Sequence, residues 1–124
     1  MRFPFPFALL LAAAITLILG YSGIVTFLGA HPFWAQSTSW IGAIAGAAVA
    51  LVLLWFRVPR MLALGLAGVV LLAAGLAAYF GKAEFVASYA ENGLAGRFWY
   101  IGWMVGLGAL TSLIAVGVGR ARGA

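Results

Sequence analysis

The sequence predicts an all-α membrane protein with four transmembrane helices in an up-down bundle. Of its 124 residues, 66% are apolar and only 7% are charged, whereas soluble domains have about 45–50% apolar and about 25% charged residues. A domain this small buries only about two thirds of its surface when it folds in water. Most of the apolar surface therefore needs lipid as its solvent.

Four apolar runs without Lys, Arg, Asp or Glu supply the predicted spans. A helix needs roughly 20 residues to cross about 30 Å of hydrocarbon. The third run is apolar on every side rather than along one stripe, which is typical of a membrane span, and no run alternates as a barrel strand would. We therefore predict a single integral membrane domain over residues 1–124, with spans at about 5–28, 39–56, 61–80 and 98–118.

The first run carries two features that affect its ends. Its roughly 24 residues exceed the 7–15 apolar residues of a signal peptide, so we expect it to be retained as a span. Near its outer end, Tyr21 and Ser22 lie between Gly20 and Gly23. Two glycines beside a phenol and a hydroxyl predict a small polar niche or a kink.

The connections between the runs contain the expected helix breakers. Pro59 cannot continue a helix, so residues 57–60 predict a tight hairpin between the second and third spans. Before the second span, the hydroxyls of residues 37–39 are expected to cap free backbone N–H groups.

The third connection, residues 81–97, is the longest. Phe85 and Tyr89 would share one helical face and Glu84 and Glu91 another, and Asn92-Gly93 would end the helix. We predict a short helix there, lying at the membrane surface.

Orientation follows from the positions of Lys and Arg at the ends of the spans. With four spans, both termini and the second connection share one side, and the other side holds only Lys82 and Arg97. This asymmetry predicts an N-in, C-in topology, with Glu84 and Glu91 offsetting the two outer cations. The cytoplasmic side collects Arg2, Arg57, Arg60, Arg120 and Arg122.

We thus interpret the positive charge as setting the orientation of the protein and attracting anionic lipid. A nucleic-acid site would need a denser basic patch. The predominance of Arg over Lys and the heavy use of Ala and Gly favour a GC-rich bacterial genome. We therefore expect a multi-pass protein of the bacterial inner membrane.

Aromatic residues gather at the predicted outer ends of the spans, where Trp and Tyr prefer the headgroup level. They predict a shared outer platform for a headgroup, a quinone or a partner helix, although ordinary interfacial anchoring explains the same pattern. The platform residues are Trp34, Trp40, Phe85, Tyr89, Trp99, Tyr100 and Trp103.

Small residues at four-residue spacing predict faces where helix backbones approach closely. Both packing within the chain and packing against a second protein fit this pattern. The hydroxyls of Thr16, Thr111 and Ser112 are expected to bond to carbonyls of their own helices. The predicted packing positions are Gly42, Gly46 and Ala50 in the second span, Gly102 and Gly106 in the fourth, and Ala12, Thr16 and Gly20 in the first.

Chemistry-bearing residues are scarce. The chain has no Cys and one His, so we predict no metal, haem or iron–sulfur site and no other cofactor. The spans contain no ionisable group of the kind that pumps and carriers place in their bundles. The outer charged residues lack an accompanying nucleophile, so we expect no enzymatic activity.

The sequence favours a structural or accessory subunit that packs against a larger membrane complex or against copies of itself. Such a protein would contact lipid and would hold a lipid or quinone at its outer aromatic belt. The alternative is a small transporter or pore-forming protein, which would work as an oligomer because four such spans enclose no polar path alone.

Overall fold

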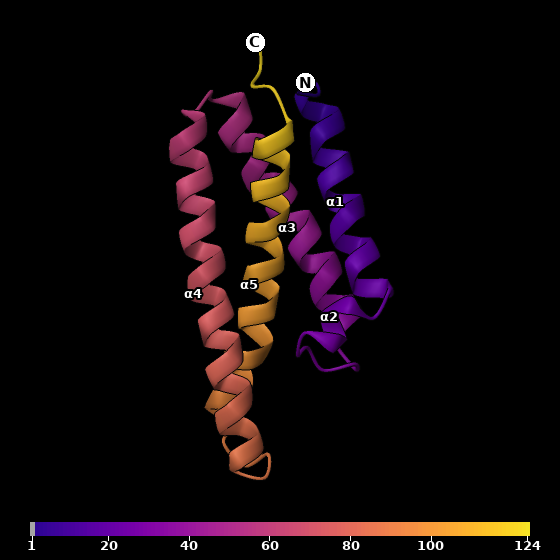
Figure 1. Cartoon of the computed structure of the whole chain (residues 1–124), viewed down its shortest axis with the longest axis vertical. Helices are drawn as coiled ribbons and strands as arrows, with labels where there is room; N and C mark the ends of the chain where they lie inside the picture. The colour runs from indigo at the N-terminus through magenta and orange to yellow at the C-terminus, as the bar shows by residue number, and fades with distance from the viewer. Residues whose placement is uncertain (1) are drawn as a thin grey trace.

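The fold of residues 2–124, taken from a computed structural model, is a bundle of helices lying side by side (Figure 1). The all-helical fold class is confirmed. The helices are α1 (Phe5–Tyr21), α2 (Ile24–Phe27), α3 (Ala35–Trp55), α4 (Arg60–Ala87) and α5 (Gly93–Val118).

Three of these helices, α3, α4 and α5, are long and apolar enough to cross a membrane. Helix α1 is also apolar but has 17 residues. The central helix is α5, which packs against α4, α3 and α1, whereas α4 packs extensively against α5 alone. The protein thus has the character of a helical membrane bundle.

The first predicted span, residues 5–28, is divided into two helices. Ser22 ends α1, and Gly23 adopts a left-handed conformation with φ +89° before the single turn of α2. Only glycine adopts this conformation without strain. The expected kink is therefore a complete break in the helix.

The second predicted span begins earlier than residue 39, because α3 starts at Ala35 after Trp34. The hydroxyls of Thr38 and Ser39 do not cap the helix. They donate back to the Ala35 carbonyl at 2.9 and 2.8 Å, and both side chains are buried against the bundle.

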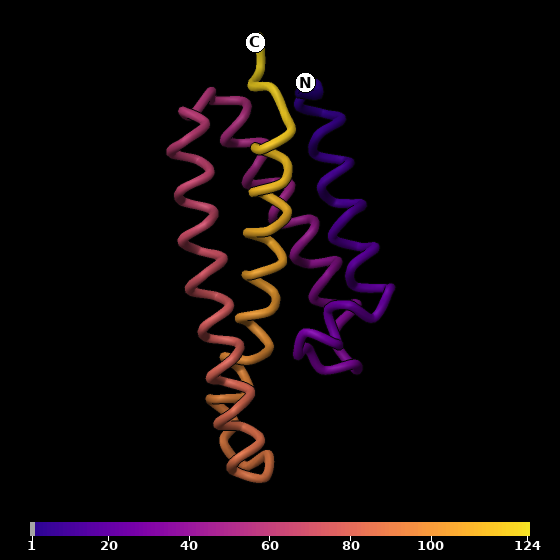
Figure 2. The backbone as a smooth tube through the Cα atoms, viewed as in Figure 1, coloured from indigo at the N-terminus to yellow at the C-terminus, as the bar shows by residue number. Residues whose placement is uncertain are grey.

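The predicted surface helix between the third and fourth spans is wrong. Helix α4 continues without interruption through Gly81 to Ala87, and α5 begins at Gly93 (Figure 2). Gly81 permits this because it lets α4 stay close to α5: an added Cβ would lie 2.6 Å from the Trp99 nitrogen. The apolar pattern around Phe85 belongs to the last turns of α4, whose Phe85 ring packs on Gly96.

A short turn closes this hairpin. Tyr89 and Ala90 have positive φ values of 54° and 66°. Asn92, expected to end a helix, instead begins one, because its side-chain oxygen accepts a hydrogen bond from the Ala95 nitrogen at 3.1 Å. The hairpin extends beyond the segment that carries α2 (Figures 1 and 2).

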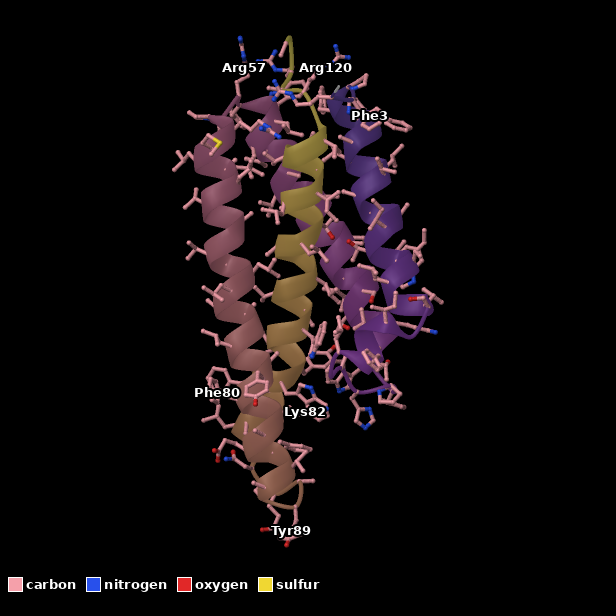
Figure 3. The ribbon with its side chains drawn as sticks, viewed as in Figure 1. Phe3, Arg57, Phe80, Lys82, Tyr89 and Arg120 are labelled. Carbon is pink, nitrogen blue, oxygen red and sulfur yellow. The ribbon has the colours of Figure 1, made fainter. Side chains whose placement is uncertain are left out.

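Both termini and the α3–α4 connection lie at the opposite end of the bundle, with Arg57 and Arg120 (Figure 3). There the backbone nitrogens of Phe3 and Arg120 donate to the Val118 and Phe3 carbonyls, each at 2.7 Å. The two ends of the chain are therefore tied to each other.

Two arginine side chains at this end bind helix C-termini. Arg60 donates to the Gly117 carbonyl at 2.7 Å. Arg122 donates to the Trp55 carbonyl at 3.1 Å and lies 4.6 Å from the centre of the Trp55 ring. Cations are favourable at these positions because a helix C-terminus carries partial negative charge.

Candidate functional site

Helices α3 and α5 approach each other closely where they cross. A Cβ added to Gly42 would lie 2.7 Å from the Leu107 Cβ, and one added to Gly46 would lie 2.3 Å from the Gly108 carbonyl oxygen. Both distances are shorter than real Cβ atoms adopt. Gly42 and Gly46 therefore face another helix of the same chain.

Buried hydroxyl groups accompany this crossing. Ser112 of α5 donates to the Gly46 carbonyl of α3 at 2.9 Å, so it bonds between helices and not, as expected, within its own. The Thr16 and Thr111 hydroxyls contact each other across α1 and α5. Each also lies within reach of its own helix, at 3.1 Å from the Ala12 carbonyl and 2.8 Å from the Leu107 carbonyl.

These two threonines share three contacts but supply only two hydroxyl hydrogens. One hydroxyl therefore donates to its own helix while the other donates across the interface. Of the buried side-chain polar atoms in residues 2–124, none lacks a hydrogen-bond partner.

The other predicted packing positions also face neighbouring helices of this chain, but they are not all equally close to the neighbouring helix. Gly20 lies directly against Ser39, and Gly102 lies against the backbone of Ala78. Gly106 is looser, because a Cβ there would lie 3.7 Å from Ala74. Ala12 and Ala50 are fully buried in the core cluster that also contains Leu54, Ala63, Ala115 and Val116.

Four residues of the predicted outer platform form an aromatic cluster with His31, and we define this cluster as His31, Trp34, Phe85, Trp99 and Tyr100. Trp99 is at its centre, 5.3 Å from Trp34, 5.7 Å from His31 and 5.8 Å from Phe85 between ring centres. Its indole N–H donates to the Gly29 carbonyl at 2.9 Å. The cluster thus fastens the segment between α2 and α3 to the α4–α5 hairpin.

Three of the predicted platform residues lie outside this cluster. Tyr89 is 92% exposed at the tip of the hairpin (Figure 3). Trp40 donates to the Tyr21 hydroxyl at 2.9 Å, and Trp103 packs beside Val25 and Ala35. The seven residues therefore do not form one continuous platform.

An apolar groove runs along the face where α3 and α4 diverge on either side of α5. One part, of about 420 Å³, lies between α3 and α4, and a second part, of about 510 Å³, lies between α4 and the outer half of α5. The two parts share Val70 and Val105. We name this combined feature the long groove; its walls include Ile41, Val49, Leu66, Ala73 and Phe98.

Sequence reasoning did not find the long groove. Its lining residues belong to three helices, and their apolar side chains resemble those of the lipid-facing surface. The one available signal is the run of small residues Gly108 and Ala109 next to Ser112 in α5, which lines the bottom of the groove.

Comparisons with known proteins give no relative: no family model, curated protein or solved structure matches the chain. Among residues 2–124, no group of three or more His, Asp or Glu side chains is placed to hold a metal ion. The main surface features of the bundle are the long groove and the charged residues at its two ends (Figure 3).

Proposed function

We propose that this protein is a non-enzymatic accessory subunit of the bacterial inner membrane that receives a transmembrane helix of another subunit in its long groove. The observation that supports this proposal is the length of the groove. Along α5 its lining runs from Leu94 to Ser112, which corresponds to about 27 Å of helix. This length is close to the hydrocarbon thickness of a bilayer, about 30 Å.

The residues of the groove suit a helix. Gly108 and Ala109 at its bottom present little side chain, and small residues let helix backbones approach closely where lipid removes the hydrophobic drive for association. Val70 and Val105 are 45% and 42% exposed, so a partner would gain contact with them.

The proposed membrane arrangement has four spans, with α1 as the fourth. Its 17 residues give about 25 Å, at the short end of the range of about 17–25 residues for a transmembrane helix. The grouping of Arg2, Arg57, Arg60, Arg120 and Arg122 at one end supports an N-in, C-in orientation. Lipid would contact the remaining apolar surface.

Reporter fusions test this topology. Fusions after Arg60 and after Ala124 are expected to report a cytoplasmic location, and a fusion after Gly93 a periplasmic one, because basic residues near span ends are retained in the cytoplasm. A periplasmic report from Ala124 would contradict the four-span arrangement while leaving the helical bundle itself intact.

Site-specific photo-crosslinking tests the groove. With a photoreactive residue at Val105, irradiation of intact membranes is expected to give one protein adduct of defined mass. The matched control is Leu10 of α1, which is 72% exposed and does not line the groove. An adduct at twice the mass of the chain would identify a second copy as the partner.

A groove-filling variant completes this test. Ala73→Trp is expected to abolish the adduct at Val105, because the indole would occupy the groove that Ala73 lines. Leu72→Trp on the neighbouring exposed face is the control and should leave the adduct unchanged. Equal protein adducts from Val105 and Leu10, or no protein adduct from Val105, would contradict the proposal.

The transport alternative requires a polar path or a hydrophobic gate. The buried hydroxyls of Thr16, Thr111 and Ser112 are engaged with one another or with backbone carbonyls. No specific observation therefore favours transport over the accessory role.

A further inference from the structure

A second apolar groove lies on the other flank of the α4–α5 pair, and we propose that it binds the acyl chain of an anionic phospholipid whose phosphate is held by Lys82. This lysine groove has a volume of about 840 Å³. Leu71, Gly75 and Lys82 of α4 and Trp103 and Leu110 of α5 line it.

The part of the groove inward of Lys82 has the depth of a single leaflet. Lys82 follows Arg60, the first residue of α4, by 22 residues, or about 33 Å of helix. With Arg60 at one membrane surface, Lys82 is at the headgroup level of the other. The lining on α4 runs from Leu71 to Ala87, and Lys82 lies within it. The part inward of Lys82, as far as Leu71, is about 16 Å long, which is close to half of the hydrocarbon thickness.

This depth distinguishes a lipid chain from a protein helix. A transmembrane helix of a partner would need contact along the full thickness of about 30 Å, as the long groove provides. An acyl chain that enters at the headgroup level ends near the bilayer midplane, where the lysine groove also ends.

The charge at the mouth of the groove determines the expected headgroup. Lys82 is the only charged residue in the lining. Its ammonium group lies 5.7 Å from the centre of the Trp99 ring, and the side chain projects from α4 toward the side where α2 lies (Figure 3). Glu84 cannot face it, because residues two apart lie on different sides of a helix, and Glu84 lines a separate hollow with Phe80 and Phe98.

Further groups at the mouth fit a phospholipid. Gly29, with φ +128°, brings its backbone close to Lys82, since a Cβ there would lie 3.8 Å from the ammonium nitrogen. A phosphate held by the Lys82 ammonium would therefore also lie beside the Gly29 backbone. Trp103, one turn of α5 after Trp99, also lines the groove.

Native mass spectrometry of the full-length protein, released from nanodiscs of defined composition, tests this proposal. We expect phosphatidylglycerol to be retained in preference to phosphatidylcholine. Lys82→Gln is expected to reduce the preference about fivefold, the effect of one basic residue at an anionic surface. Arg97→Gln is the charge control, because Arg97 lines the long groove instead and should leave the preference unchanged.

A second variant tests the acyl-chain site independently of charge. Gly75→Leu adds a side chain where an added Cβ meets no atom within 4 Å, so it should fill the lysine groove without disturbing the helices. Retention of both lipids is expected to fall, whereas Gly65→Leu, at another open glycine of α4, should leave it unchanged.

Other outcomes would overturn the proposal. Equal retention of the two lipids, with no effect of Lys82→Gln, would exclude an anionic headgroup site. Retention of a neutral quinone in place of phospholipid would assign the groove to a different ligand, and unchanged retention in Gly75→Leu would exclude the groove itself. Ala73→Trp in the long groove should not alter lipid retention, so failure of the partner-helix proposal is distinguishable from failure of this one.

Discussion

Replacing Gly46 with isoleucine is expected to destabilise the protein strongly. The new Cβ would lie 2.3 Å from the Gly108 carbonyl oxygen and 2.7 Å from the Thr111 Cβ. The first of these is backbone, which cannot rotate away, so α3 and α5 must separate. Overpacking of this kind costs about 1–3 kcal/mol.

Separation of the helices would also remove an interhelical hydrogen bond. Ser112 donates to the carbonyl of Gly46 itself, and such bonds contribute about 0.6 kcal/mol on average in membranes. We therefore expect Gly46→Ile to approach the upper end of the overpacking range. The measurement is the free energy of unfolding in mild detergent as denaturing detergent is added.

Gly65→Ile provides the matched control for this substitution. Gly65 is a glycine of α4 whose added Cβ meets no atom within 4 Å, so the same side chain should be accommodated with little change in stability. Equal stability of Gly46→Ile and the unmodified protein would contradict the α3–α5 crossing described above.

Substituting alanine at Gly102 is the second change with a large expected effect, because it acts on the one helix that holds α4. An added Cβ would lie 2.7 Å from the Ala78 nitrogen and 2.9 Å from the Ala74 carbonyl oxygen. Since α4 packs extensively only against α5, the cost of about 1–3 kcal/mol falls on this single interface. Hydrogen exchange should therefore accelerate in α4 more than in α1 and α3.

Gly106→Ala is the control on the same ridge of α5. Its Cβ would lie 3.7 Å from the Ala74 Cβ, an ordinary contact, and alanine favours the helix over glycine by about 1 kcal/mol. We expect Gly106→Ala to be neutral or stabilising. Equal destabilisation by the two alanine substitutions would contradict the closer approach of α4 at Gly102 than at Gly106.

Composition and apolar run length were sufficient to predict the all-helical class of this protein and the approximate positions of its long helices. The break at Pro59 and the end of α5 at Val118 agree with the predicted spans. Helix boundaries were predicted less well where a hydroxyl side chain can either cap a helix or bond to a carbonyl within it. Residues 37–39 resembled helix caps, but Thr38 and Ser39 lie within α3 because their hydroxyls bond to the preceding turn.

The third connection shows why the remaining features required the tertiary structure. Glu84, Phe85 and Val86 have the same amphipathic spacing whether they form a separate surface helix or the last turns of a longer one. The outcome depends on the contact of Gly81 with Trp99 and of Phe85 with Gly96 across the hairpin. A local pattern contains no information about such a contact.

The sequence by itself determined that this chain is helical and apolar, with most of its basic residues near the predicted cytoplasmic ends of the spans. These features are readable because hydropathy, helix breakers and charge are properties of single residues and short runs. Only the tertiary structure decided which small residues meet. It placed Gly42 and Gly46 against α5 while leaving Gly65 and Gly75 open, and it separated the long groove from the lysine groove. The physical reason is that close approach and grooves depend on how three helices diverge, and that geometry is set by side-chain packing between segments far apart in the chain.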